Sequence, residues 1–273
     1  MESYWFTFFI FAFGAVIGSF LAALSYRLPR EISILRGRSF CPKCKKKIPL
    51  FLNIPIISFF LLGGRTRCCN RPLSPRYPLI ETVTAILFVI FWQIFVSCGK
   101  NSNLIDHGAV CEYKTMMGVW ALPFLFLVLS ALVIIFVTDL EYQLIPDTVS
   151  FFLFFLTLTS LILWSEPLLF TKIFWGFFAA TLLLILHLVT RGRGMGLGDV
   201  KLAIFAGVMI GYPKIVSFFL LSFWLGGLVG LILIFLKKAT LKKRIAFGPF
   251  LIISLIITLI WGNIIDGFFL SLP

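Results

Sequence analysis

Between two apolar segments of the chain stands the stretch Arg191-Gly-Arg-Gly-Met-Gly-Leu-Gly-Asp199-Val-Lys201. A glycine in a helix interior costs about 1 kcal/mol relative to alanine, so four alternating glycines predict that the preceding helix ends here. Unwound backbone at membrane depth is tolerated only where protein or a water-filled cavity satisfies its polar groups. An ionisable residue at such a place is a functional candidate when a partner can be named. Asp199 is therefore a candidate site residue.

The partner that we infer for Asp199 is Asp139, where another apolar run meets the short loop Asp139-Leu-Glu-Tyr-Gln-Leu-Ile-Pro-Asp147. The helix dipole disfavours an anion at a helix C-terminus, so no role in stabilising the helix explains an acid at position 139. Asp147 follows a proline and is interpreted as the N-cap of the next helix. Asp199 taken alone could also be an N-cap. Together, Asp139 and Asp199 predict an intramembrane aspartyl protease.

Composition places the chain among polytopic membrane proteins. Of its 273 residues 60% are hydrophobic and 13% are charged, and the mean hydropathy is +1.05. A soluble domain of this size could not keep so much apolar surface out of water. Crossing the bilayer core takes about 20 apolar residues, and we expect an all-α protein with about eight transmembrane helices. The expected spans lie near 4–25, 79–97, 117–138, 148–164, 172–190, 200–212, 215–236 and 248–266.

These spans divide the chain into three expected parts. Residues 1–25 are the first transmembrane helix, 26–78 are a basic, cysteine-containing segment, and 79–273 are a seven-helix membrane core. In the first span, Gly14 and Gly18 have the GxxxG spacing that lets two helices approach closely. Helix packing is the preferred interpretation of these two glycines.

The basic residues predict the orientation of the chain in the membrane. Of the 24 lysines and arginines, 20 fall in the segment 26–78, the glycine-rich stretch and the segment 237–244. Because basic loops remain in the cytoplasm, these three segments are expected there and both termini outside. The formal charge of +13 then indicates attraction to anionic lipid headgroups rather than to nucleic acid.

Four cysteines in the segment 26–78 are candidate metal ligands. So short a segment rarely folds without a staple such as a metal ion. Cys41-Pro-Lys-Cys44 has the spacing of a zinc hairpin, and Cys68-Cys69 supplies two more thiols. Adjacent cysteines reach one tetrahedral ion with difficulty, so zinc and a disulfide both stay open, although a reducing compartment disfavours the disulfide.

Two further cysteines, Cys98 and Cys111, lie in a loop expected on the outer side. If that side is oxidising, a disulfide closing this loop of about 14 residues would stabilise the fold by about 3 kcal/mol. Two separate thiols are the alternative interpretation.

Other chemistry finds little support in the sequence. The isolated His107 and His187 lack metalloprotease or serine-protease motifs, and His187 is interpreted as a hydrogen-bonding residue between helices. An ion-coupled transporter could also use a broken helix and intramembrane acids, but no repeat relates the two halves of the chain. A non-enzymatic membrane scaffold is a third alternative.

The chain resembles the bacterial type IV prepilin peptidases (leader peptidase and N-methyltransferase), which are GxGD intramembrane aspartyl proteases, along nearly its whole length. The matching stretches are Gly18-Ser-Phe20, Tyr26-Arg-Leu-Pro29, Cys41-Pro-Lys-Cys44, Asn53-Ile-Pro55, Ser74-Pro-Arg-Tyr-Pro-Leu-Ile-Glu81, Asp139-Leu-Glu-Tyr-Gln-Leu-Ile-Pro-Asp147 and Gly196-Leu-Gly-Asp-Val-Lys201.

This resemblance implies that Asp139 and Asp199 are the catalytic pair and that the substrates are type IV prepilin or pseudopilin precursors. It also implies a location in the bacterial cytoplasmic (inner) membrane and N-methylation of the new N-terminus with S-adenosylmethionine. The sequence carries no glycine-rich nucleotide fingerprint for that cofactor.

In one respect the chain departs from the family pattern. Aligned on Ser74-Pro-Arg-Tyr77, the second cysteine pair of the family falls at positions 66 and 69, but position 66 is threonine here and Cys68 is additional. Zinc would then need Cys41, Cys44 and Cys69, with Cys68 or a water as the fourth ligand. A peptidase that lacks the methyltransferase activity is therefore an alternative.

Overall fold

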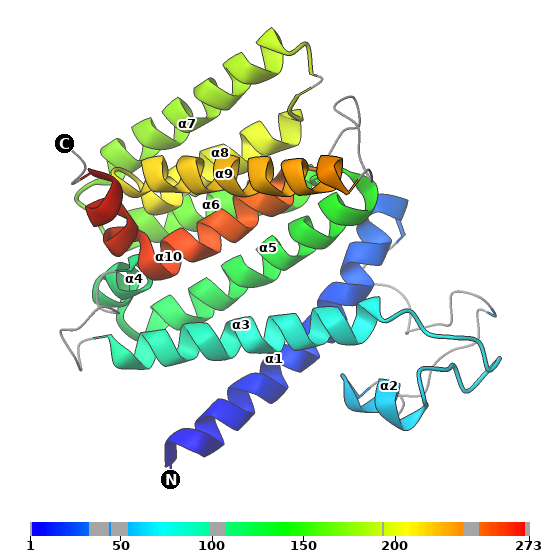
Figure 1. The fold of residues 1–273 in the computed structure, drawn as a ribbon. Helices are drawn as coiled ribbons and strands as arrows, with labels where there is room; N and C mark the ends of the chain where they lie inside the picture. Colours follow the sequence, from blue (N-terminus) through cyan, green and yellow to red (C-terminus); the bar gives the residue numbers. More distant parts are fainter. Residues whose placement is uncertain are drawn as a thin grey trace. The chain divides into compact units, whose positions relative to one another are not determined.

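The computed structural model describes residues 2–32, 44, 54–98, 108–192, 194–236 and 246–270. Within these ranges the regular secondary structure is helical, apart from one antiparallel bridge between Arg65 and Pro72 (Figure 1). The prediction of an all-α membrane protein is confirmed. The helices are α1 (Glu2–Arg27), α2 (Ile57–Leu61), α3 (Arg76–Ser97), α4 (Ala109–Met117), α5 (Ala121–Tyr142), α6 (Asp147–Leu163), α7 (Leu169–Val189), α8 (Leu197–Ile210), α9 (Lys214–Phe235) and α10 (Gly248–Leu270).

Every expected span contains a helix, but not every helix is long enough to cross a membrane. Six are long and apolar enough among the described residues. Among the eight expected spans, the two that are too short are α6, with 17 residues, and α8, with 14. At 1.5 Å per residue α8 is about 21 Å long, shorter than the bilayer core of about 30 Å. The length criterion therefore supports six spans, and the expected count of eight is not confirmed.

The chain forms two compact units, and α3 and α5 contribute to both. Unit 1 comprises Met1–Gln93 and Phe124–Val137, and unit 2 comprises Ile94–Pro123 and Thr138–Pro273. In unit 1 the predicted glycine packing is confirmed. A Cβ atom at Gly14 would lie 2.8 Å from the Cα of Ala85, and one at Gly18 would lie 2.7 Å from the Cα of Glu81. Only glycine lets α1 approach α3 this closely.

At the centre of unit 2 lies α8, which packs against α6, α7, α9 and α10 (Figure 1). Ten of its residues are buried. Its contact with α7 is a backbone contact, because a Cβ atom at Gly207 would lie 2.6 Å from the Cα of Gly176. Since helices in lipid associate through close packing rather than a hydrophobic driving force, this contact fixes α8 firmly.

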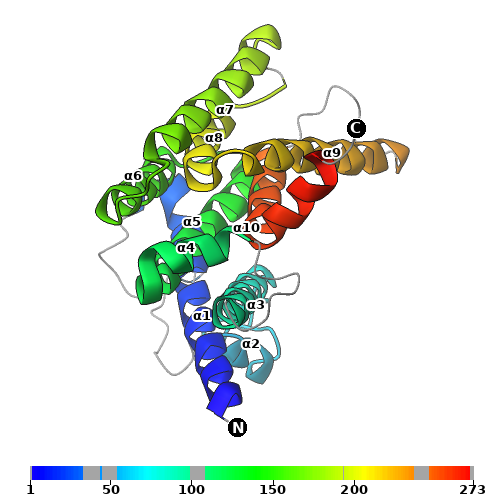
Figure 2. The ribbon, with the colours of Figure 1, turned by 90° about the vertical axis from the view of Figure 1, so that its left-hand side faces the viewer.

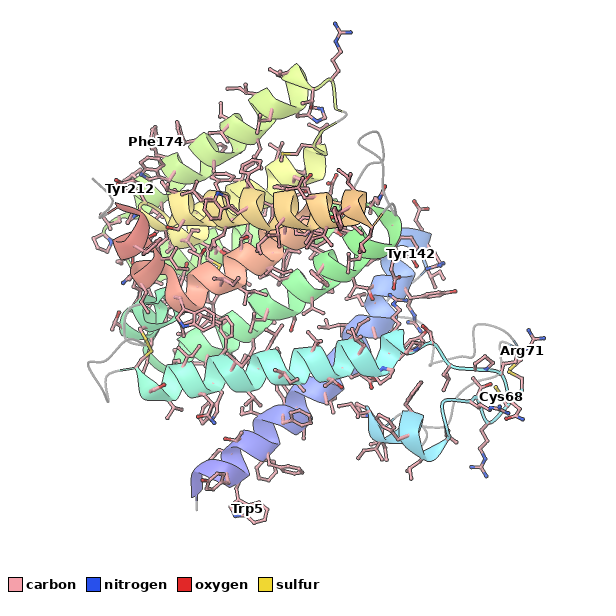
Figure 3. The ribbon with its side chains drawn as sticks, viewed as in Figure 1. Trp5, Cys68, Arg71, Tyr142, Phe174 and Tyr212 are labelled. Carbon is pink, nitrogen blue, oxygen red and sulfur yellow. A yellow bond between two sulfur atoms is a disulfide. The ribbon has the colours of Figure 1, made fainter. Side chains whose placement is uncertain are left out.

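The short helix α4 is attached to its surroundings through four consecutive residues. Cys111 forms a disulfide with Cys98, seen as the yellow bond beside α4 in Figure 3, so the conditional expectation of this bond is confirmed. The other three residues make polar contacts with other segments: Glu112 pairs with Lys214, the Tyr113 hydroxyl donates to Met209 O, and Lys114 donates to Phe95 O and Cys98 O. Figure 2 shows α4 beside α10, against which it also packs.

Candidate active site

Asp139 lies in the last turn of α5, where the helix ends abruptly. Gln143 has a left-handed backbone (φ 52°), and its N–H donates to the Asp139 carbonyl at 2.9 Å. The Asp139 side chain is 6% exposed, and Oδ2 has no hydrogen-bond partner among the described residues. An acid buried at the negative end of a helix dipole is unfavourable for folding, so its position calls for a functional explanation.

Asp199 lies in the first turn of α8 and is likewise 6% exposed. Helix α7 ends at Val189, and the left-handed residues Arg191 (φ 51°) and Gly192 (φ 71°) turn the chain toward the next helix. The N-cap is Gly196, whose N–H donates to Asp199 Oδ2 at 3.0 Å. The N-cap interpretation of Asp199 is therefore wrong in position, although its carboxylate does accept the N-cap amide from within the first turn.

The structure brings the two acids together within unit 2. Their carboxyl groups lie close enough to interact electrostatically. The loop between α5 and α6 fills the space beside them, because a Cβ atom at Gly198 would lie 2.8 Å from Ile145 Cβ. Burial strengthens the interaction between like charges, so the charge on either carboxyl group affects the other.

A third helix end, the start of α10, reaches Asp139. A Cβ atom at Gly248 would lie 2.5 Å from Asp139 Oδ2 and 3.2 Å from Ile145 Cδ1. The Gly248 backbone N–H also interacts with the Asp139 carboxyl group. Gly248 is not among the site residues expected from the sequence, where its one local signal is a glycine–proline pair at the start of an apolar run.

Asp147 does not act as the cap that was predicted. Pro146 is the N-cap of α6, without a side-chain cap bond, and Asp147 is the first residue of the helix. Its carboxylate pairs instead with Lys201 at 2.6 Å, linking the start of α6 to α8. The proline places the acid one residue too late to cap, so it turns to the nearest cation.

We expect Asp147→Asn to retain cleavage activity. The Asp147–Lys201 pair is partly exposed, with side chains 58% and 34% accessible, and such pairs contribute about 0–1 kcal/mol. The measurement is the initial rate of precursor cleavage beside the wild type, with the amount of membrane-inserted protein as the control. A complete loss of cleavage at normal protein levels would place Asp147 in the catalytic machinery.

His187 makes a hydrogen bond, as predicted, but its partner lies in the glycine-rich stretch and not in another helix. Its Nδ1 lies 2.7 Å from the carbonyl oxygen of Met195, and its ring lies over Gly192. The histidine thus connects the end of α7 to the glycine-rich stretch before α8. It organises the stretch that carries Asp199.

In unit 1, three of the four predicted metal ligands gather at one place. The ligand atoms of Cys44, Cys68 and Cys69 all lie within 4.8 Å of one another. The Cys44 and Cys68 sulfurs are 3.1 Å apart, and those of Cys68 and Cys69 are 3.9 Å apart. Tetrahedral zinc with bonds of about 2.3 Å separates its sulfur ligands by about 3.8 Å, so the three thiols fit the ion with a small shift. Cys41 lies outside the described residues.

A tight turn explains how adjacent cysteines can both belong to this cluster. Thr66 N donates to Arg71 O at 2.8 Å, and Asn70, with φ 51°, closes the turn on Thr66 O. The Thr66 hydroxyl contacts Cys69 Sγ at 3.1 Å, while Cys68 faces Cys44. Cys68, Cys69 and Arg71 belong to the segment that connects α2 to α3 in the sequence, and Figure 3 labels Cys68 and Arg71 there. Cys68 therefore supplies a third thiol to the cluster, while position 66 contributes a hydroxyl group beside Cys69.

If the cluster binds zinc, elemental analysis of the purified protein should find about one ion per chain. Cys68→Ser should lose that ion because it removes a thiolate, whereas Thr66→Ser should keep it because the hydroxyl stays. A native preparation that is folded but contains no zinc would contradict the metal hypothesis.

The fold and the acid pair together define a polytopic helical membrane protein with two buried aspartates at helix ends. Residues 12–95 match the family model described as "Bacterial Peptidase A24 N-terminal domain". Residues 126–231 match the model described as "Type IV leader peptidase family". The chain belongs to the type IV leader peptidase family.

Its curated relatives carry the name prepilin leader peptidase/N-methyltransferase. The protein of Bacillus subtilis (strain 168) is 30% identical, over 96% of this chain and 97% of its own length. That of Aeromonas hydrophila is 29% identical over 96% and 93%, and that of Klebsiella pneumoniae is 32% identical over 78% and 89%. No solved structure matches the chain.

Proposed function

We propose that this protein is a membrane aspartyl endopeptidase that removes the leader from type IV prepilin-like precursors at the cytoplasmic face of the inner membrane. The observation that carries the proposal is the meeting of Asp139 and Asp199, both buried, at the ends of two helices of unit 2. Membership of the leader peptidase family and the names of the relatives supply the substrate class.

The acid pair can cleave a peptide bond by general acid–base catalysis. One carboxylate takes a proton from a water molecule as the water oxygen attacks the scissile carbonyl carbon. The other, protonated, carboxyl group donates a hydrogen bond to the carbonyl oxygen and stabilises the charge that develops there. The proton then passes to the leaving amine as the C–N bond breaks, without a covalent intermediate.

We further propose that the protein methylates the N-terminal amine that cleavage exposes. The names of the relatives support this activity, and S-adenosylmethionine would supply the methyl group. The segment 26–78 is the largest polar part of the chain, so we assign methylation to it and cleavage to 79–273.

Purified protein in detergent, incubated with a pilin-like precursor, tests the proposal. Mass spectrometry should find the precursor shortened by its basic leader. With S-adenosylmethionine present, the new N-terminus should gain one methyl group. Cleavage without methylation would support the peptidase-only alternative. No cleavage of any prepilin-like precursor would contradict the proposed function.

The orientation with both termini outside remains part of the proposal. It is supported by the basic residues, because 20 of 24 fall on the side assigned to the cytoplasm. Two lysines on the other side are paired with acids, Lys172 with Glu166 at 3.3 Å and Lys214 with Glu112. Such pairing reduces the positive charge on the side assigned to the outside.

We expect a single engineered cysteine near position 45 to react with a membrane-impermeant thiol reagent only from the cytoplasmic side, and one near position 103 only from outside. The measurement compares labelling in intact cells with that in inverted membrane vesicles, in a background whose native cysteines are blocked first. Labelling with the opposite sidedness would contradict the proposed orientation.

A further inference from the structure

The start of α10 approaches the acid pair more closely than any residue with a side chain could. At Gly248 an added Cβ atom would lie 2.5 Å from Asp139 Oδ2 and 3.1 Å from Asp139 Cγ. The φ angle of Gly248 lies outside the left-handed region, so its backbone conformation is open to other residues. What this position requires from glycine is space, not backbone freedom.

Gly248 differs from the packing glycines of unit 2 because it faces a side chain, whereas they face backbone atoms. Added Cβ atoms at Gly108 and Gly207 would meet backbone atoms of other helices at 2.4 Å and 2.6 Å. Such contacts cannot be relieved without moving a helix, so these two glycines serve packing. At Gly248 the obstructed atom is the end of a side chain, which can rotate away. A methyl group at position 248 would therefore displace the Asp139 carboxyl group rather than the fold.

Displacement of this carboxyl group affects the chemistry directly. Asp139 is buried, and its carboxyl group is one of the two that the proposed mechanism uses for proton transfer, so its position matters for the reaction. Ile145 lies against both Gly198 and Gly248, and it spaces the start of α10 from the start of α8. The end of α5 and the starts of α8 and α10 thus surround the carboxyl pair.

We propose that Gly248 is a positioning residue of the aspartyl site. By carrying no side chain at the start of α10, it allows the Asp139 carboxyl group to stand where it shares a proton with Asp199. This inference rests on the proposed peptidase function, but its structural core, the contact between position 248 and Asp139, does not depend on activity.

The kinetic test is Gly248→Ala in the purified full-length protein. A misplacement of about 1 Å in a reacting group costs about 100-fold, so we expect kcat for precursor cleavage to fall by about that factor. KM should stay within about twofold, because the methyl group displaces an acid and not the substrate-binding backbone. Gly267→Ala is the matched control: it lies in the same helix, with nothing within 4 Å of its added Cβ atom, and should keep wild-type kinetics. Wild-type kcat in Gly248→Ala would overturn the inference.

A thermal-unfolding cycle tests the contact without any substrate. Gly248→Ala should lower the unfolding midpoint of the wild-type protein by more than it lowers that of Asp139→Ala, where no carboxyl group obstructs the new methyl group. If Gly248→Ala fails to fold and the double variant folds, the contact is supported. The inferred contact would be overturned if Gly248→Ala lowered the unfolding midpoint equally in the wild-type and Asp139→Ala proteins. It would also be overturned if neither Gly248→Ala nor the double variant folded. An inactive wild type would count against the proposed function alone, since this cycle would still decide the role of Gly248.

Discussion

Asp139→Asn and Asp199→Asn are each expected to reduce cleavage of a prepilin-like precursor by about a thousandfold or more. Asparagine has nearly the same shape as aspartate but can neither accept the proton of the attacking water nor supply the proton that the leaving amine needs. Removal of either acid disables the whole pair, because each step of the reaction uses both carboxyl groups. The measurement is the rate of leader removal by purified enzyme under single-turnover conditions.

The control for this experiment must itself be a buried aspartate. Asp266 is 5% exposed, lies in the last turns of α10 and hydrogen-bonds to Ser217. Asp266→Asn removes a charge from the same unit but no group of the proposed pair, so cleavage should persist. All three variants should accumulate in the membrane at comparable levels. Normal turnover by either Asp139→Asn or Asp199→Asn would remove that residue from the catalytic assignment.

The helices and the acid pair could be predicted because their signals are local in the sequence. Apolar runs of about 20 residues identify membrane helices without knowledge of their neighbours. Asp139 and Asp199 each stand at a boundary between an apolar run and a short polar stretch, where a charge is costly enough to need a reason. The two motifs could therefore be paired before any contact was known.

The details of the site depend on contacts between distant segments. Gly248 lies far from Asp139 in the sequence, and nothing near it shows that a carboxyl group occupies the space of its missing side chain. The link between Asp147 and Lys201 was missed for the same reason, since a local interpretation offers a cap first. Lys201 is adjacent to the glycine-rich stretch, yet its partner comes from another helix.

The cysteine cluster shows a third kind of limit. Adjacency of Cys68 and Cys69 argued against a shared ion, because the two side chains of neighbouring residues normally diverge. The turn closed by Asn70 in a left-handed conformation brings both sulfurs toward Cys44. Asparagine is among the few residues that adopt this conformation readily, so the sequence held a signal for the turn but not for its consequence.

The two proposed activities are expected to fail separately. Asp199→Asn should no longer cut a precursor but should still methylate a pilin that is supplied already cut. Cys44→Ser should cut at the wild-type rate and methylate poorly. Proton transfer between carboxyl groups has no part in moving a methyl group to an amine, whereas methylation needs an uncharged amine and a bound sulfonium donor. The acids belong to unit 2, whereas Cys44, Cys68 and Cys69 belong to unit 1.

Methylation by the two variants can be compared only on pilin that is supplied already cut. An uncut leader hides the amine, so any variant that cannot cleave would look unable to methylate if it received only precursor. With pre-cut pilin, each variant serves as the folding control for the other, because each must retain the activity that its partner loses. Loss of methylation on pre-cut pilin by Asp199→Asn, in a preparation that unfolds at the wild-type temperature, would show that one site performs both reactions. If the native protein cuts but never methylates, the threonine at position 66 becomes the first residue to replace. Thr66→Cys should restore methylation if the departure from the family's cysteine pair is the cause of the loss.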